Sequence, residues 1–135
     1  MVPDVVAVYV RSTPVTLRSR AGLFVRQLNL ALKFLLELAA LAAFALWGAS
    51  IADGAAAVAC AVGLPLGVAM LWGLLAAPKA RRRLSTRLRI PFELGVFALA
   101  TLALLGAEAA IAAAGFAAIV AVNALFLTAF DQWDA

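Results

Sequence analysis

The stretch NLALKFLLELAALAAFALW, from Asn29 to Trp47, is an almost unbroken apolar run with one carboxylate, Glu37, inside it. About 20 apolar residues in a helix are enough to cross the hydrocarbon core of a bilayer, which is about 30 Å thick. Ala and Leu favour helix, and strict alternation of polar and apolar residues is absent. The stretch therefore predicts a membrane-spanning helix that carries an acidic group within its apolar length.

The composition of the whole chain agrees with a membrane environment. The 135 residues are 67% hydrophobic and 13% charged, and the mean hydropathy is +1.07. Soluble domains are roughly half apolar and a quarter charged, so this composition excludes an ordinary soluble domain. The pI of about 10.2 does not indicate nucleic-acid binding, because the basic residues stand beside apolar runs rather than on a soluble face.

Four apolar runs divide the chain, and lipid leaves their backbone groups no hydrogen-bond partner outside a helix or a closed barrel. The fold class predicted is all-α, a transmembrane four-helix bundle in one domain, residues 28–130. Its spans are expected at about 28–49, 54–77, 90–107 and 109–130. Residues 131–135, DQWDA, are expected to form a short C-terminal tail that meets the basic loop or the lipid headgroups.

Residues 1–27 are predicted to be an N-terminal tail. The segment does not look like a signal peptide, because its arginines follow the short Val-rich piece instead of preceding an apolar core. The tail is expected to be partly unstructured, with Leu23, Phe24 and Val25 resting on the membrane surface. An alternative interpretation makes residues 5–10 a strand or a docking segment for a partner.

All eleven basic residues belong to one side of the predicted bundle. The connections near Asp53 and Glu108 carry none, and positively charged loops stay in the cytoplasm, so both termini are expected there. The loop between the second and third spans contains Lys79, Arg81, Arg82, Arg83 and Arg87, followed by Arg89. These residues set the topology and attract anionic lipid in one interpretation, and contact a phosphate-bearing ligand or a partner in the other.

An internal repeat relates the first and third spans, KFLLELAALAAFAL and RIPFELGVFALATL. Lys33 matches Arg89 and Glu37 matches Glu93, in both cases 56 residues further along. Because both spans start on the same side, the repeat predicts two parallel helical hairpins related by an axis along the membrane normal.

The polar side chains of the first span fall on one face. At 100° per residue, a single arc of about 80° contains Arg26, Asn29, Lys33 and Glu37. An ionised carboxylate facing lipid is costly, so Glu37 and the equivalent Glu93 are expected to point into the bundle.

Two interpretations of these carboxylates remain open. In the structural one, Glu37 pairs with Lys33, Glu93 pairs with Arg89, and the pairs cross-link one end of the bundle. In the functional one, both carboxylates line a vestibule open to the cytoplasm, where a carboxyl group exchanges its proton for a cation.

The second span is predicted to kink at Pro65, and Gly63 and Gly67 at four-residue spacing favour close helix packing over a cavity. Trp72 lies deeper than an interfacial aromatic belt, so its indole N–H is expected to find a partner in the bundle, with Glu37 or Glu93 the candidates by depth. In the fourth span, Asn123 is expected to hydrogen-bond across helices.

The residues of known catalytic and metal sites are missing. The chain has no His, which excludes the usual zinc, haem and di-iron ligand sets and the Ser-His-Asp triad. It has no Gly-rich phosphate loop, and the single Cys60 allows neither an intramolecular disulfide nor a metal spacing. We therefore expect no enzymatic activity, no metal and no cofactor.

Three stretches, NLALKFLLELAALAAFALWG, MLWGLLAAPKARRRL and PFELGVFALATLALLGA, resemble the YrdB-like family of small bacterial membrane proteins. The similarity covers residues 28 to 127 and implies four helices in a bacterial inner membrane, with no established activity. The carboxylate in the first helix also gives an analogy with the small multidrug-resistance transporters. Their other motifs are not matched, and the one-sided charge bias differs from members that insert in both orientations.

Two classes of function follow as hypotheses. The first is a small carrier or channel, acting as a homo-oligomer, in which Glu37 and Glu93 respond to protons or cations. The second is a non-catalytic accessory or assembly subunit of a larger membrane complex. The partners expected are membrane lipids and other membrane helices, and not nucleic acid.

Overall fold

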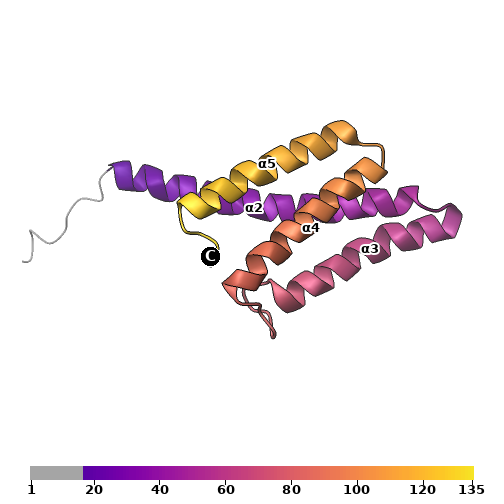
Figure 1. Ribbon diagram of the computed structural model, residues 1–135, viewed down its shortest axis with the longest axis horizontal. Helices are drawn as coiled ribbons and strands as arrows, with labels where there is room; N and C mark the ends of the chain where they lie inside the picture. The colour runs from indigo at the N-terminus through magenta and orange to yellow at the C-terminus, as the bar shows by residue number, and fades with distance from the viewer. Residues whose placement is uncertain (1–16) are drawn as a thin grey trace, which may run out of the picture.

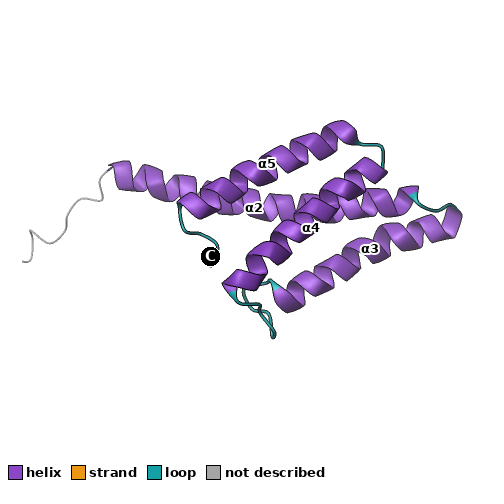
Figure 2. Ribbon diagram, in the orientation of Figure 1, coloured by secondary structure: helices purple, strands orange, loops and turns teal. Residues whose placement is uncertain are grey.

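The computed structural model describes residues 17–135 and, over that range, contains four helices and no strand (Figures 1 and 2). In chain order they are α2 (Leu17–Ser50), α3 (Gly54–Leu75), α4 (Thr86–Gly106) and α5 (Ala110–Ala129). All four are long and apolar enough to cross a membrane. The predicted all-α transmembrane four-helix fold is therefore confirmed, while the alternative for residues 5–10 lies outside the described residues.

Two helices begin earlier than the sequence predicts. Helix α2 begins at Leu17 rather than at residue 28, so part of the predicted N-terminal tail is helical. Helix α4 begins at Thr86 rather than at residue 90, and its first turn is closed by the Ser85 carbonyl, which accepts from the amides of Leu88 and Arg89. Apolar runs mark where a helix meets lipid, whereas arginine-rich segments also favour helix and extend it past that boundary. The other bounds differ from the predicted ones by two residues or fewer.

Helix α2 is the central element, and it packs against α3, α4 and α5. Its contact with α4 is built on small side chains: Ala40 and Ala43 of α2 and Ala100 and Ala103 of α4 are all buried. Small residues let two helix backbones approach closely in a bundle that lies in lipid. The larger core side chains include Phe97 of α4, packed edge-on against the ring of α5 Phe116. The core therefore lies among α2, α4 and α5.

Helix α3 is peripheral. It contacts α2 extensively and, unlike α4 and α5, contains no buried residue. The helix runs through Pro65 without interruption. The close packing predicted at Gly63 and Gly67 is wrong within the described residues, because a Cβ added to either glycine would meet none of their atoms within 4 Å. Gly48 of α2 makes the close approach instead: a Cβ there would lie 2.5 Å from the carbonyl oxygen of Cys60.

The helices form two hairpins, α2–α3 and α4–α5, and α2 and α4 run in the same direction (Figure 1). This is the arrangement that the repeat predicts. The hairpins differ in their surroundings, because α5 buries four side chains in the core whereas α3 buries none. The two copies of the repeat therefore share a topology without sharing an environment.

Candidate functional site

Buried polar side chains gather at one end of the bundle, which holds the α3–α4 connection (residues 76–85) and residues 130–135 (Figure 1). We call it the basic end. The buried polar residues there are Asn29, Lys33, Arg89, Glu93, Asn123 and Gln132. They come from α2, α4, α5 and the C-terminal segment, so this cluster joins three of the four helices and leaves out α3.

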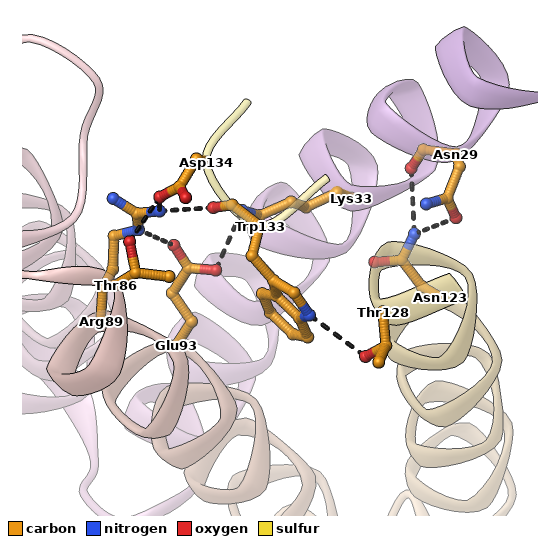
Figure 3. A network of polar contacts seen from close by, with 9 residues as sticks. All are labelled: Asn29, Lys33, Thr86, Arg89, Glu93, Asn123, Thr128, Trp133 and Asp134. Carbon is orange, nitrogen blue, oxygen red and sulfur yellow. Dashed lines mark hydrogen bonds and ion pairs between the residues drawn. The ribbon is translucent and has the colours of Figure 1, made fainter. Parts of the chain in front are cut away.

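Glu93 is the centre of the charged contacts (Figure 3). Lys33 Nζ lies 2.9 Å from its Oε2, and Arg89 Nε lies 3.5 Å from its Oε1. The predicted pairing of Arg89 with Glu93 is confirmed. The predicted pairing of Lys33 with Glu37 is wrong, because Lys33 reaches across to α4. A basic residue four positions before an acid is also the weaker orientation for a pair within one helix.

The C-terminal segment folds back onto this cluster instead of extending as a tail (Figure 3). Arg89 Nη2 donates to Asp134 Oδ1 at 2.9 Å and to the Trp133 carbonyl oxygen, and the Thr86 hydroxyl donates to Asp134 Oδ1. The hydrogen bond from Thr86, and then the one from Arg89, hold the pKa of Asp134 below its usual value. The sequence indicates that DQWDA meets basic residues, but Thr86 carries no signal that singles it out.

A second group of contacts ties α5 to α2. Asn123 Nδ2 donates to Asn29 Oδ1 at 2.8 Å and to the Asn29 carbonyl oxygen at 2.9 Å, which confirms the predicted hydrogen bond across helices (Figure 3). Asn29 Nδ2 in turn donates to Gln132 Oε1, and Gln132 Nε2 donates to the carbonyl oxygen of Arg26. These amides satisfy one another inside the bundle, and their geometry is that of a structural joint.

Glu37 stands apart from both groups. It is half-buried, and within residues 19–135 no side chain or backbone group forms a hydrogen bond or an ion pair with its carboxylate. Lys33, one turn away on the same helix, is held by Glu93. Glu37 is therefore an intramembrane carboxylate with no direct partner among the described residues.

Glu37 lines two adjoining pockets, which we call outer and inner. The outer pocket, of about 400 Å³, lies at the basic end, and its charged lining residues are Lys33, Glu37, Arg83, Arg89 and Glu93. The inner pocket, of about 210 Å³, lies among α2, α3 and α4, and its lining is apolar apart from Glu37 and the Trp72 indole. Glu37, Phe34 and Trp72 line both, so they stand at the boundary.

Trp72 is held by ring contacts rather than by a hydrogen bond. Its ring lies 6.0 Å from that of Phe92 and 6.1 Å from that of Phe97, both on α4. The expected partner for its indole N–H, Glu37 or Glu93, is not found, since none of the described residues accepts a hydrogen bond from it. The depth of Trp72 in its span predicts that it lies near Glu37, and the two pockets that both residues line agree with this. Depth does not predict the direction of the indole N–H.

The basic loop adds little to the site itself. Five of its cationic side chains are exposed: Lys79, Arg81, Arg82, Arg83 and Arg87. Of these five, Arg83 alone lines the outer pocket. The part of the chain described here contains no group of three or more side chains placed to hold a metal ion. The arrangement can bind or exchange a cation at one carboxylate, and it holds no nucleophile paired with a base.

The family model described as "Protein of unknown function (DUF2568)" matches residues 31–121, and the chain belongs to this family. The match includes Lys33, Glu37, Arg89 and Glu93, whereas Asn123 and the C-terminal segment fall beyond it. Neither the curated proteins nor the solved structures gave a match.

Proposed function

We propose that this member of the DUF2568 family is a small membrane carrier or channel in which Glu37 exchanges a proton for a cation. The single observation behind the proposal is the setting of Glu37. Its carboxylate lies in a membrane-spanning helix, lines both pockets, and lacks a hydrogen-bond or ion-pair partner in the described part of the chain. Ionisable groups within spans are costly and are functional candidates for that reason.

The charge balance of the basic end supports this choice of residue. Lys33 and Arg89 supply two positive charges, and Glu93 and Asp134 supply two negative charges in direct contact with them. This network is neutral without Glu37. An ionised Glu37 therefore adds an uncompensated negative charge, which a bound proton or a bound cation neutralises.

The proposed setting is the cytoplasmic membrane of a bacterium, with both termini and the basic loop in the cytoplasm. The positive-inside rule supports this orientation, since the connections at the opposite end carry no Lys or Arg. The resemblance to the YrdB-like family supports the bacterial compartment. The exposed arginines of the loop are then placed to attract anionic lipid.

Proton flux in liposomes tests the proposal. The purified protein is reconstituted into vesicles with an acidic interior that contains a pH-sensitive dye. A cation, K⁺ or benzyltrimethylammonium in separate runs, is added outside, so that its entry is exchanged for proton exit. We expect flux with the native chain, loss of flux with Glu37→Gln, and unchanged flux with Glu108→Gln, the same substitution at an exposed site in the opposite connection. A Glu37→Gln protein that remains monodisperse and conducts as the native chain does would overturn the proposal.

One observation favours a second candidate, a non-catalytic accessory or assembly subunit. Helix α3 buries no residue, and an open apolar groove on it, lined by Gly63, Gly67 and neighbouring side chains, is not covered by any element among the described residues. Glycine faces of this kind pack against helices of other subunits. A stoichiometric foreign protein in the mildly solubilised particle, measured by intact mass, would support this candidate over the autonomous carrier.

A further inference from the structure

The inner pocket combines one acid with an otherwise apolar wall. Its lining contains the aromatic side chains of Phe34, Trp72 and Phe97, together with Leu, Val, Ala and Gly residues of α2, α3 and α4. Glu37 supplies the only carboxylate, and there is no other acceptor side chain in the lining. A ligand that fits this pocket must carry a group that neutralises the negative charge of Glu37 and an apolar part that packs against the apolar wall.

This combination excludes most classes of ligand. Ca²⁺ and Mg²⁺ take roughly six or more oxygen ligands in proteins and Zn²⁺ takes about four nitrogen, sulfur or oxygen ligands, whereas the inner pocket offers the oxygens of a single carboxylate side chain. An anion is repelled by the carboxylate, and a neutral apolar molecule leaves that carboxylate buried without a partner, which is costly. A cation with an apolar body satisfies both features.

We infer that the ligand of the inner pocket is an amphiphilic organic cation, with its charged centre at Glu37 and its apolar body among Phe34, Trp72 and Phe97. The inference rests on the proposed function, because it names the class of cation that Glu37 exchanges for its proton. Aromatic faces add to the attraction, since a cation over a ring is stabilised further when water is excluded. In the exchange, the carboxyl proton leaves to solvent as the cation binds, and no covalent bond changes in the ligand.

The surroundings of the pocket give the ligand a route through lipid. In the outer pocket, Lys33 and Arg89 are neutralised by Glu93 and Asp134, and Arg83 is the remaining cationic side chain that opposes the approach of a cation from the basic end. The inner pocket lies between α3 and α4, and these helices do not share the extensive contact that each makes with α2. A molecule with an apolar body partitions into the bilayer and reaches this opening from the side.

Three matched probes test the inference by calorimetry on the purified protein. Benzyltrimethylammonium has both the charge and the ring, neopentylbenzene is its neutral isostere, and tetramethylammonium lacks the apolar body. We expect the first to bind to the native chain more tightly than either of the others. Glu37→Gln should weaken its binding by roughly 30-fold or more, as expected when one partner of a desolvated charge pair is removed, and Glu108→Gln should leave it unchanged.

A second variant keeps the inference falsifiable if Glu37→Gln fails to fold. Trp72→Leu should weaken the binding of benzyltrimethylammonium, whereas Trp72→Phe, which keeps an aromatic face, should retain most of it. Equal binding of the charged probe and its neutral isostere, or equal binding by the native chain and Glu37→Gln, would overturn the inference. If flux depends on Glu37 but the organic cation does not bind, the inference is overturned and the proposed function stands. If there is neither flux nor binding, the proposed function is overturned as well.

Discussion

Glu37 and Glu93 are equivalent by the internal repeat, yet they occupy different environments. On α4, Glu93 is 2% exposed and bonded to two cations, whereas Glu37 on α2 is half-buried at the edge of two pockets. The buried positions explain the difference. Around the carboxylates, α2 buries Leu36 and Ala40 whereas α4 buries Glu93, so at this turn the two helices present faces about one residue apart. Because of that rotation, Lys33 forms its ion pair with Glu93, and Glu37 has no ion-pair partner among the described residues.

Glu93→Gln is predicted to be the more damaging of the two amide substitutions for stability. It leaves Lys33 and Arg89 buried without their shared carboxylate, and breaking a buried ion pair in this way costs about 3–5 kcal/mol. Glu37→Gln removes no hydrogen bond or ion pair within residues 19–135 and should leave the melting temperature unchanged or raised. Thermal unfolding of both variants in one detergent gives the comparison, and a larger loss for Glu37→Gln would contradict the assignment.

Acid is predicted to release the C-terminal segment. The hydrogen bonds from Thr86 and Arg89 lower the pKa of Asp134 from its usual value of 3.8. A carboxyl group whose pKa is lower in the folded state than in the unfolded state stabilises the fold at pH values above the unfolded-state pKa. This stabilisation is lost as the pH falls through the folded-state pKa. The fluorescence of Trp133, isolated by replacing Trp47 and Trp72 with Phe, should therefore change below about pH 3.8. Asp134→Asn should remove this transition, and its persistence in that variant would contradict the account.

At the scale of the elements, α3 is attached to the bundle mainly through α2. The attachment depends on Gly48, whose lack of a side chain lets the α2 backbone lie against the α3 backbone at Cys60. The contact between Trp72 and the rings of Phe92 and Phe97 is what joins α3 to α4 around the inner pocket. Both attachments set the width of the opening through which a ligand reaches Glu37.

Gly48→Ala is predicted to destabilise the α2–α3 hairpin, although Ala is the better helix former by about 1 kcal/mol. The added Cβ would lie 2.5 Å from a backbone carbonyl oxygen, which cannot move without shifting α3. Gly63→Ala is the matched control, because its Cβ would meet no atom of the described residues within 4 Å. We expect a lower melting temperature for the first and an unchanged or higher one for the second. Destabilisation by Gly63→Ala instead would place another subunit against α3.

For the whole molecule, hydropathy was sufficient to predict the four helices, because a backbone in lipid must satisfy its own hydrogen bonds. It was not sufficient to predict where α2 and α4 begin, since Arg-rich segments outside lipid also form helix. Asn123 was predictable as a polar group that needs a partner in lipid. The ion pair of Lys33 with Glu93 was not predictable, because it depends on the rotation of α2 against α4. Neither was the contact of Thr86 with Asp134, which requires the C-terminal segment to fold back.

The orientation of the whole molecule gives a prediction of its own. With Cys60 replaced by Ala, a cysteine placed at Arg82 should be labelled by a membrane-impermeant maleimide only after the cytoplasmic face is exposed. A cysteine at Glu108 should be labelled from outside intact spheroplasts. Both positions are exposed in the fold. The reverse pattern would contradict the positive-inside orientation.

Proton release on cation binding is the measurement that tests the role of Glu37 most directly. Benzyltrimethylammonium is added to the purified protein in a weakly buffered detergent solution, and the pH change is recorded at several starting pH values. The account predicts that protons are released as the cation binds to the native chain, in proportion to the cation bound, and that Glu37→Gln releases none. Cation binding without proton release, or equal release from the native chain and Glu37→Gln, would contradict it.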